Sequence, residues 1–430
     1  TDDDVAGFTI AESGGSTSVD ESGNTDTFTV VLNAQPTTDV VLSISSADTG
    51  EATVTSSLTF TSANWDTAQT VTVTGADDNI VDGSVTSTIT VTVNDGSSDD
   101  NFDSVSDQTV SVSTTDDDVA GFTIAESGGS TSVDESGNTD TFTVVLNKAP
   151  LSDVVFAISS SDEGEATVTG SLTFTSANWD TAQTVTVTGA DDSAIDGTVT
   201  STITVAINDG TSDNAFDSVT DQTVSVTTAD DDVAGFTIAE TGGSTGVDES
   251  GNTDTFTVVL NAQPTTDVVL SISPSDTGEA TATSSLTFTT ANWNAAKTVT
   301  ITGVDDDIID GTQTSTITVS IIDGISDDAF DSVADQTVSV TTTDDDVAGF
   351  TVTETEGSTG VSESGTTDLF TIVLNTQPGS DVVLSITSSD TDEATVDSLI
   401  QFTSANWDTP QNVTVTGVDD GIIDGTQTST

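Results

Sequence analysis

The side chains in this sequence with evident chemical potential are carboxylates. Their most distinctive arrangement is a triplet of Asp residues that repeats along the chain. Asp116, Asp117 and Asp118 are adjacent, and the same triplet recurs at 230–232, at 344–346 and at 2–4. Adjacent carboxylates repel, by roughly 1 kcal/mol per pair at about 4 Å in water and by about 4 kcal/mol near a protein surface. The triplet must therefore stay solvated or be neutralised by a cation.

Composition restricts both the cation and the class of function. The 430 residues hold 73 acids, two bases (Lys148 and Lys297), no His and no Cys, so the formal net charge is −71. Only oxygen ligands are available, which selects a hard cation, and flexible six- to eight-fold oxygen coordination favours Ca²⁺ over Mg²⁺. The missing His and Cys exclude Ser–His–Asp and Cys–His catalysis and predict that the protein is not an enzyme. The charge predicts no nucleic-acid partner, and no apolar run is long enough for membrane insertion.

The triplet marks the boundary of a long internal repeat. Val5, Val119, Val233 and Val347 share one spacing, 119 − 5 = 114, and Trp65 recurs with the same period. This period is too long for a solenoid unit and fits a domain of about 100–150 residues. The predicted divisions are 1–4 (end of a preceding repeat), 5–118 (repeat 1), 119–232 (repeat 2), 233–346 (repeat 3) and 347–430 (repeat 4, incomplete).

Repeat 4 is predicted to lack its last two strands, because the sequence stops at Thr430, before the counterparts of Ile89–Val93 and Gln108–Ser113. We interpret the sequence as a window of a longer array. A second interpretation is that another chain donates the missing strands.

Short runs in which Val, Ile, Leu and Phe alternate with Thr and Ser predict the elements that hold the acids. Such alternation is typical of half-buried strands, and no window has helical periodicity. We therefore predict an all-β fold of tandem antiparallel immunoglobulin-like sandwiches of about seven strands, arranged as an extended rod. The predicted strands of repeat 1 are Ala6–Ala11, Thr27–Asn33, Asp39–Ser45, Ala52–Thr61, Gln69–Gly75, Ser87–Asn94 and Gln108–Thr114.

Successive loops of such a sandwich alternate between its two ends, so distant acids should meet at one end. In repeat 1 that end receives Glu12, Asp20, Glu21, Asp48, Glu51, Asp77, Asp78, Asp82 and the triplet at 116–118. We predict a cation site there, to which Asp213 and Asp217 of repeat 2 are possible further contributors. At the opposite end lie Asp39, Asp66 and the acids of the loop before the last strand, Asp95, Asp99, Asp100, Asp103 and Asp107. We interpret the acids of that loop as solvated turn residues, because Asp is a common turn former.

Four short motifs resemble the Calx-β domain family over nearly the whole of each repeat. They are Val-Asp-Glu-Ser-Gly at 19–23, Asp-Thr-Gly at 48–50, Asp-Asp-Asn-Ile-Val-Asp-Gly at 77–83 and Asp-Asp-Asp-Val-Ala-Gly-Phe at 116–122. The resemblance implies Ca²⁺ held by these acidic loops. This sequence departs from the family at Ser84, Thr198 and Gln313, where further Glu is usual, and at Ser362, the counterpart of Asp20.

The residues to which the resemblance assigns calcium binding form one set in each repeat. In repeat 1 they are Glu21, Asp48, Asp77, Asp78, Asp82, Asp116, Asp117 and Asp118. In repeat 2 they are Glu135, Asp162, Asp191, Asp192, Asp196, Asp230, Asp231 and Asp232. In repeat 3 they are Glu249, Asp276, Asp305, Asp306, Asp310, Asp344, Asp345 and Asp346, and in repeat 4 Glu363, Asp390, Asp419, Asp420 and Asp424.

These patterns favour a secreted or cell-surface protein, a stretch of an extracellular fibre or giant adhesin in which Ca²⁺ rigidifies each junction. Its partners would be calcium ions and further copies of the repeat, in a longer chain or a homopolymeric fibre, with glycans possible. The sequence is also compatible with a carbohydrate-binding module that uses Trp65, although one Trp beside a strand in each repeat is more typical of a core position. A regulatory calcium sensor and acidic spacer domains of a saline habitat, without metal sites, are compatible with it as well.

Overall fold

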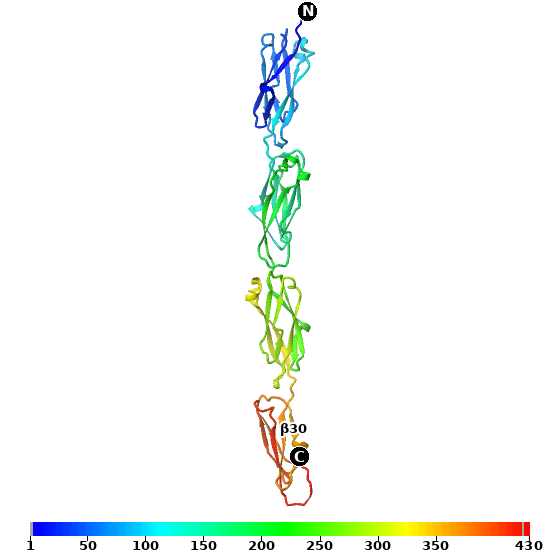
Figure 1. The fold of residues 1–430 in the computed structure, drawn as a ribbon, viewed down its shortest axis with the longest axis vertical. Coiled ribbons are helices and arrows are strands. Elements are labelled where there is room, and N and C mark those ends of the chain that lie inside the picture. Colours follow the sequence, from blue (N-terminus) through cyan, green and yellow to red (C-terminus); the bar gives the residue numbers. More distant parts are fainter. Residues whose placement is uncertain (1–2, 424) are drawn as a thin grey trace. The chain divides into compact units, whose positions relative to one another are not determined.

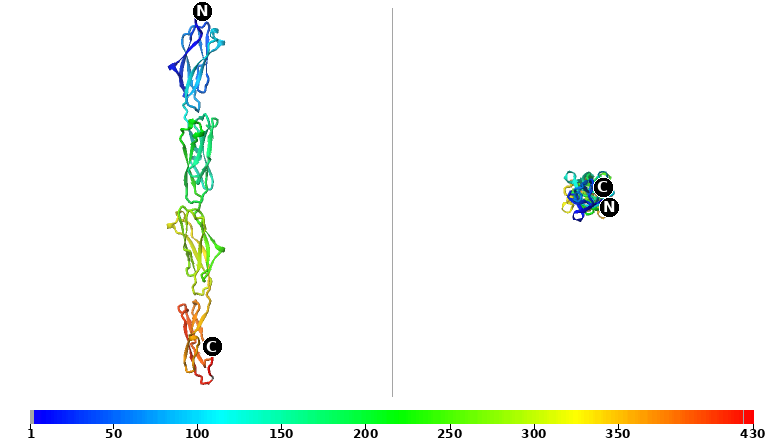
Figure 2. Two further views of the ribbon diagram at one scale, coloured as in Figure 1. Left: turned by 45° about the vertical axis from the view of Figure 1, so that its right-hand side comes forward. Right: turned by 90° about the horizontal axis from the view of Figure 1, so that it is seen from above.

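The computed structural model describes residues 3–423 and 425–430, and the regular elements in this part are β-strands and short 3₁₀ turns (Figure 1). Each of the first three repeats is a sandwich of a four-stranded and a five-stranded sheet. Within a repeat the strands lie along one common axis, so the loops gather at the two ends of the sandwich (Figure 2). Among the described residues, no helix has the length and hydropathy that a membrane crossing requires.

Repeat 1 contains the sheets β1-β3-β7-β5 and β2-β10-β9-β4-β6. Its strands are β1 (Phe8–Glu12), β2 (Thr17–Asp20), β3 (Thr25–Leu32), β4 (Val40–Ser46), β5 (Ala52–Val54), β6 (Ser57–Phe60), β7 (Gln69–Gly75), β8 (Ile80–Val81), β9 (Val85–Val93) and β10 (Gln108–Thr115). Its 3₁₀ turns are η1 (Ser13–Gly15), η2 (Asp95–Ser97) and η3 (Asp100–Phe102).

Repeats 2 and 3 have the same two sheets. In repeat 2 the elements are β11 (Phe122–Glu126), η4 (Ser127–Gly129), β12 (Thr131–Asp134), β13 (Thr139–Leu146), β14 (Ala149–Pro150), β15 (Val154–Ser160), β16 (Ala166–Val168), β17 (Ser171–Phe174), β18 (Gln183–Gly189), β19 (Val199–Ile207), η5 (Asp209–Thr211), η6 (Asn214–Phe216) and β20 (Gln222–Ala229). In repeat 3 they are β21 (Phe236–Glu240), η7 (Thr241–Gly243), β22 (Thr245–Asp248), β23 (Thr253–Leu260), β24 (Val268–Pro274), β25 (Ala280–Ala282), β26 (Ser285–Phe288), β27 (Lys297–Gly303), β28 (Gln313–Ile321), η8 (Asp323–Ile325), η9 (Asp328–Phe330) and β29 (Gln336–Thr343).

The alternating side chains build the core, as the sequence predicts. In β3 the buried positions are Phe28, Val30 and Leu32, and they pack against Val40 and Leu42 of the facing sheet in one hydrophobic cluster. Burial of apolar surface contributes about 25 cal/mol per Å² and is the main stabilising term of such a sandwich. The all-β, immunoglobulin-like fold class is therefore confirmed.

The predicted strands differ from the observed ones in two places. The segment predicted as one strand over Ala52–Thr61 is two strands, β5 and β6, which belong to opposite sheets. The first predicted strand continues as β2, which pairs in parallel with β10, so the sandwich is not wholly antiparallel. Gly14, with φ of 77°, lies in the left-handed region at the crossover between β1 and β2, a conformation that glycine adopts without strain.

Repeat 4 contains one complete sheet and part of the other. Its elements are β30 (Phe350–Glu354), η10 (Thr355–Gly357), β31 (Thr367–Leu374), β32 (Val382–Ser385), β33 (Ala394–Val396), β34 (Leu399–Phe402) and β35 (Gln411–Gly417). The second sheet consists of β32 and β34 alone. Within the described range, residues 359–362 form no counterpart of β2, whose parallel partner in repeat 1 is β10. Phe350 and Val352 are consequently half exposed, at 53% and 51%.

The chain divides into two compact units. The first unit holds residues 1–192 and 197–231, and the second holds residues 193–196 and 232–430. The first unit thus contains the junction between repeats 1 and 2, and the second unit contains the junction between repeats 3 and 4. The division itself passes through the junction between repeats 2 and 3.

Candidate metal centre

Four segments of repeat 1 are joined by backbone hydrogen bonds at the end where β10 finishes. The Glu21 N–H donates to the carbonyl of Thr115 at 3.1 Å, which joins the loop after β2 to the end of β10. The Ala76 N–H donates to the carbonyl of Glu51 at 2.8 Å, which joins the loop after β7 to the loop before β5. These bonds place the acidic loops beside one another, as the alternation of loops predicts.

Gly75 permits this convergence. A Cβ atom at Gly75 would lie 1.9 Å from the carbonyl oxygen of Asp20, far inside van der Waals contact. The end of β7 can therefore approach the residue before Glu21 only because position 75 has no side chain. Gly189, Gly303 and Gly417 occupy the same close approach in the other repeats.

Glu21 lies at the centre of the converged loops. It is 1% exposed, and its Oε2 atom has no hydrogen-bond partner among the described residues. Carboxylate oxygens of Glu21, Asp78 and Asp118 lie within 4.8 Å of one another, and so do those of Glu21, Glu51 and Asp82. Glu21 is shared by the two groups, so the loops outline two neighbouring positions for a cation.

The spacing of these oxygens allows each group to share one cation the size of Ca²⁺. Ca²⁺ binds oxygen at about 2.4 Å, so two ligands on opposite sides of one ion are about 4.8 Å apart. A buried carboxylate with a lone pair facing other carboxylates is costly unless a cation or a donor neutralises it. The donor set is all oxygen, and the residues present therefore fit a hard divalent cation.

Burial and repulsion change the acidity of these groups. Burial, followed by the charge of Asp116, raises the pKa of Glu21 to about 7. Burial, followed by the charge of Asp82, raises the pKa of Glu51 above its usual value. Burial and the charge of Asp116 likewise raise the pKa of Asp82. Each of these groups binds its proton more tightly than usual because burial and the neighbouring acids disfavour its charged form.

The three Asp residues of the triplet at 116–118 make different contacts. Asp116 accepts N–H bonds from Asp82 at 2.9 Å, from Gly83 at 2.8 Å and from Asp118 at 2.6 Å, so it orders the loop after β7. The Asp118 side chain is 3% exposed and belongs to one ligand group. Asp117 is exposed, and its backbone N–H bonds to Glu21.

Other predicted ligands of repeat 1 lie at the margin of the cluster. Asp48 is exposed, and its Oδ1 accepts the Gly50 N–H at 3.0 Å within its own turn. Asp77 is exposed as well. The cation positions are thus outlined by Glu21, Asp78, Asp82 and Asp118 among the predicted set, together with one residue outside it.

That additional residue is Glu51. It is 5% exposed, its Oε2 atom has no hydrogen-bond partner in the described structure, and it shares a group with Glu21 and Asp82. The Glu-Ala pair recurs at 165, 279 and 393, but Asp48 recurs with the same period, so the sequence alone does not favour Glu51. The motif resemblance assigned the neighbouring Asp48 instead.

Repeat 3 has a related cluster within the second unit, and its group of carboxylates includes Asp344, the counterpart of Asp116. Oxygens of Glu249, Asp344 and Asp346 lie within 4.8 Å of one another, and Glu249 is 1% exposed. Burial raises the pKa of Glu249 to about 7, and the N–H groups of Gly311, Asp346 and Asp310 lower the pKa of Asp344. The remaining predicted ligands are the half-buried Asp306 and the exposed Asp276, Asp305, Asp310 and Asp345.

In repeat 2 the candidate ligands fall on both sides of the division between the units. Asp196 and Asp232 belong to the second unit, and Glu135, Asp162, Asp191, Asp192, Asp230 and Asp231 belong to the first. Glu135 is 1% exposed, and burial, followed by the charges of Asp230 and Asp192, raises its pKa to about 7.

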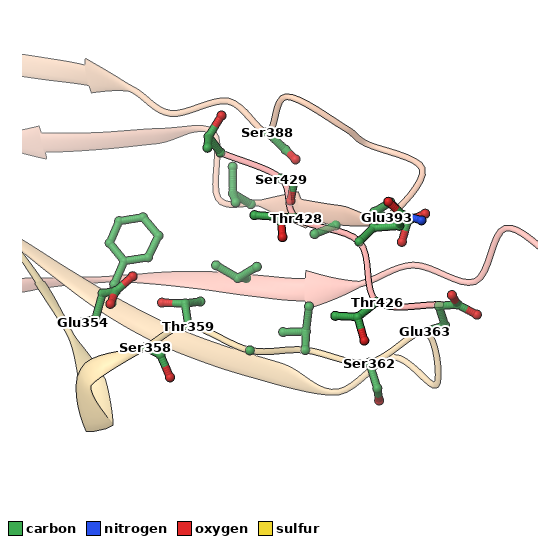
Figure 3. Close-up of a pocket in the computed structure, with 18 of the residues that line it drawn as sticks. Glu354, Ser358, Thr359, Ser362, Glu363, Ser388, Glu393, Thr426, Thr428 and Ser429 are labelled. Atoms are coloured by element: carbon green, nitrogen blue, oxygen red, sulfur yellow. The ribbon is translucent and has the colours of Figure 1, made fainter. Parts of the chain in front are cut away.

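In repeat 4 the corresponding end is open. Glu363 and Glu393, the counterparts of Glu21 and Glu51, line an open groove of about 1080 Å³ with Ser388 and Thr428 (Figure 3). Glu363 is exposed, unlike Glu21. Asp390, Asp419 and Asp420 each accept an N–H from their own loop, and Asp424 lies outside the described residues.

At the opposite end of repeat 1, the interpretation of the acids as solvated turn residues is wrong for Asp99. This residue is 3% exposed, and its Oδ2 accepts from Thr37 N–H at 2.5 Å, Thr37 Oγ1 at 2.6 Å and Thr38 N–H at 3.0 Å. Its Oδ1 accepts from the N–H of Asn101 at 3.1 Å. These bonds, led by that of the Thr37 hydroxyl, hold the pKa of Asp99 below its usual range.

Two further predictions concern residues outside the cluster. Asp213 accepts N–H bonds from Ser152 at 2.8 Å and from Ala215 at 3.0 Å, so its carboxylate is used within its own repeat. Trp65 is partly buried against the hydrophobic core of repeat 1, the position that the sequence favours over a sugar-stacking one.

The chain is similar to several solved structures, all at low sequence identity. No protein-family model matches the chain, and no curated protein does. Among solved structures, the calcium-binding-domain pair CBD12 of CALX1.2 is similar at 14% identity, over 51% of this chain and 99% of that one, with a TM-score of 0.21. The titin fragment I67–I69 is similar at 10% identity over 80% and 97%, with a TM-score of 0.26. Domains 4–9 of the surface layer protein SbsC are similar at 17% identity over 90% and 56%, with a TM-score of 0.23.

Proposed function

We propose that the chain is a calcium-binding structural array of an extracellular fibre or adhesin. Ca²⁺ binds where the acidic loops of one repeat meet the start of the next, and it holds consecutive sandwiches in a fixed relation. The array thereby acts as a stiff spacer for cell-surface attachment, cohesion or matrix formation. Its partners are calcium ions and further copies of the same repeat, and the proposal assigns no catalytic role.

The observation that carries the proposal is the Glu21 carboxylate. Glu21 Oε2 is buried, lacks a hydrogen-bond donor among the described residues and lies beside the carboxylates of Asp78, Asp82 and Asp118. Solvated surface acids would explain the net charge of −71 without placing a carboxylate in this position. A cation at the site supplies the positive charge that Glu21 Oε2 lacks.

The effect on stability follows from binding linkage. Extracellular calcium modules bind with Kd of roughly 10⁻⁴–10⁻³ M, so millimolar calcium occupies them. A ligand at 100 times its Kd stabilises the folded state by about 2.7 kcal/mol per site. Calcium binding also needs the loops before β5, after β2 and after β7 in their folded positions, because each contributes an oxygen.

We test the proposal by thermal melting of the chain in 10 mM calcium and in chelator, with small-angle scattering under both conditions. Calcium should raise Tm and increase the maximum dimension of the particle. The triple variant E21Q/E135Q/E249Q should lose most of the calcium effect. Equal melting with and without calcium would contradict the proposal.

A matched control separates the site from general charge. The variant D66N/D180N/D408N removes three exposed acids that follow the tryptophans, and repeat 3 already has Asn294 at this position. It changes the net charge as much as the glutamine variant does. The control should keep the full calcium effect, and loss of the effect in the control would assign it to bulk charge.

A further inference from the structure

The first junction, which we define as loop 76–84 with residues 116–122 and 147–151, contains a base. Lys148 of repeat 2 places its Nζ atom 2.5 Å from Asp118 Oδ1 and 3.0 Å from Asn79 Oδ1. Asp118 is one of the buried carboxylates of the candidate metal centre. An ammonium group therefore already contacts the cluster from the side of the next repeat.

This base is peculiar to the first junction. The residues that correspond to Lys148 at the period of 114 are Ala34, Ala262 and Thr376. The other base, Lys297, corresponds to Gln69 of repeat 1. Lys297 donates a hydrogen bond to the carbonyl of Thr287, and Gln69 donates the equivalent bond to the carbonyl of Thr59. Lys297 thus replaces an equivalent donor, whereas Lys148 adds a charge at a position where the other repeats have none.

The third junction, which we define as loop 304–312 with residues 344–350 and 375–379, is the natural contrast. Here Thr376 stands in place of Lys148 and Asp307 in place of Asn79, so one base is lost and one acid is gained. The Oδ2 atom has no hydrogen-bond partner among the described residues in either Asp118 or its counterpart Asp346, so the two carboxylates differ in the ion pair that Lys148 makes with Asp118 Oδ1. Burial, followed by the charges of Asp344 and Asp307, raises the pKa of Asp346.

The backbone contact between repeats is alike at the two junctions. The Ala149 N–H donates to the Asn79 carbonyl at 2.7 Å, and β14 pairs in parallel with β8. At the third junction the Gln377 N–H donates to the Asp307 carbonyl at 2.6 Å, and Ile308 bridges to Gln377. Because these bonds correspond, the charged side chains are the clearest polar difference between the junctions.

We propose that Lys148 is a resident cation that keeps the first junction closed without metal, whereas the third junction closes only when calcium is bound. The inference rests on the proposed function, since it assumes that calcium neutralises the same carboxylates. The ammonium joins Asp118 and Asn79 across the junction and lowers the negative charge around Glu21. The junctions of one array would then open at different calcium concentrations.

The apolar contact at the first junction agrees with this difference. Val81, next to Ile80 in loop 76–84, is 8% exposed and belongs to the hydrophobic cluster of repeat 2. Its counterpart Ile309 is 41% exposed, and it borders a groove of about 350 Å³ with Phe350 and Leu384. The exposure of Ile309 also reflects the second sheet of repeat 4, which contains β32 and β34 in the described residues.

The test is amide hydrogen exchange of the whole chain, read at Ala149 and Gln377 in calcium and in chelator. In calcium both amides should be protected. In chelator Ala149 should remain at least about tenfold more protected than Gln377, and K148M, which keeps the aliphatic stem, should remove this difference. K148R should retain it, because the charge persists. K297Q should also retain it, because that base lies away from the junctions.

Two gain-of-function variants test the same pair of side chains elsewhere in the chain. T376K/D307N introduces the Lys and Asn of the first junction into the third junction. A262K/S193N introduces them before repeat 3, where the Gln263 N–H donates to the Ser193 carbonyl at 2.6 Å. Both should gain protection of the adjacent glutamine amide in chelator. If neither does, or if K148M leaves Ala149 protected, the inference is overturned. If calcium protects neither amide in the parent chain, the proposed function fails instead.

Discussion

Two buried carboxylates at opposite ends of repeat 1, Glu21 and Asp99, differ in the number of donors around them. Glu21 is 1% exposed and Asp99 is 3% exposed. Asp99 accepts five hydrogen bonds, from Thr37, Thr38 and Asn101. Glu21 has an Oε2 atom without a partner in the described chain and faces other acids.

This difference separates a structural acid from a candidate ligand. Donors lower the pKa of Asp99, whereas burial and the charge of Asp116 raise the pKa of Glu21 to about 7. A carboxylate surrounded by donors needs no metal, and its ionised form stabilises the fold. A carboxylate surrounded by acids is destabilising until a cation binds. Burial alone does not mark a candidate binding site, whereas a buried carboxylate oxygen without a donor, such as Glu21 Oε2, does.

Among single substitutions, the largest expected effect is that of Asp99→Ala. The substitution leaves the N–H groups of Thr37, Thr38 and Asn101 without their acceptor, and each such loss costs about 1–3 kcal/mol when water cannot replace it. Because Thr37 and Thr38 are themselves exposed, we expect a total of about 3 kcal/mol. Hydrogen exchange across β4 (Val40–Ser46) measures this loss, which should be equal in calcium and in chelator.

Asp100→Ala is the control, since Asp100 is the exposed neighbour of Asp99 in η3. Its effect should stay within about 0.5 kcal/mol, as is usual for surface positions. A calcium-dependent loss in D99A would show that the two ends of the repeat are not separate, and the comparison would then be wrong.

A second effect, distributed over three glutamates, is expected from pH. In chelator, the raised pKa of Glu21, Glu135 and Glu249 means that the folded chain binds protons more tightly than the unfolded chain, whose glutamates titrate near 4.5. Stability should therefore fall as pH rises from about 4.5 to about 7 and stay constant above it, by roughly 1.4 kcal/mol per pKa unit. The contribution of Asp99 is present above its unfolded pKa and is lost only below about pH 4.

In saturating calcium the slope should reverse. Calcium binds the ionised carboxylates, so protons compete with it and stability should rise with pH over the same window. Thermal melting at pH 5, 6, 7 and 8 measures both slopes. The variant E21Q/E135Q/E249Q should flatten both, and equal slopes with and without calcium would remove the link between these glutamates and the metal.

The alternation of apolar residues was sufficient to predict the fold class, because each strand buries one face. Phe28, Val30 and Leu32 show this pattern plainly. It could not predict that residues 52–60 change sheets between β5 and β6, because both strands keep the same period of two. It also missed β2, whose parallel pairing depends on β10, about 90 residues further along the chain.

The site was predictable to the level of its loops. Counting turns placed the acids of repeat 1 at one end, and the backbone bonds of Glu21 and Ala76 join those loops there. The sequence could not rank acids within one loop, because Asp48 and Glu51 differ in burial and not in charge. It also could not separate Asp99 from its solvated neighbours, since its donors come from Thr37 and Thr38, more than 60 residues away.

The smallest expected effect distinguishes two acids of that one loop. Glu51 is buried and shares a ligand group with Glu21 and Asp82, whereas Asp48 is exposed and caps its own turn through Gly50. Glu51→Gln should weaken calcium binding in repeat 1 about tenfold, because it removes one charged ligand from a group of three. Asp48→Asn should weaken it about two- to threefold, through the loss of nearby negative charge alone.

Calorimetric titration with calcium at low and high salt measures both effects. The Asp48 effect should disappear at high salt, whereas the Glu51 effect should persist. A larger loss of calcium affinity in D48N than in E51Q would place a calcium ligand at Asp48, the position that the sequence motif favours. It would also show that a buried carboxylate oxygen without a donor does not identify the ligands, even within one loop.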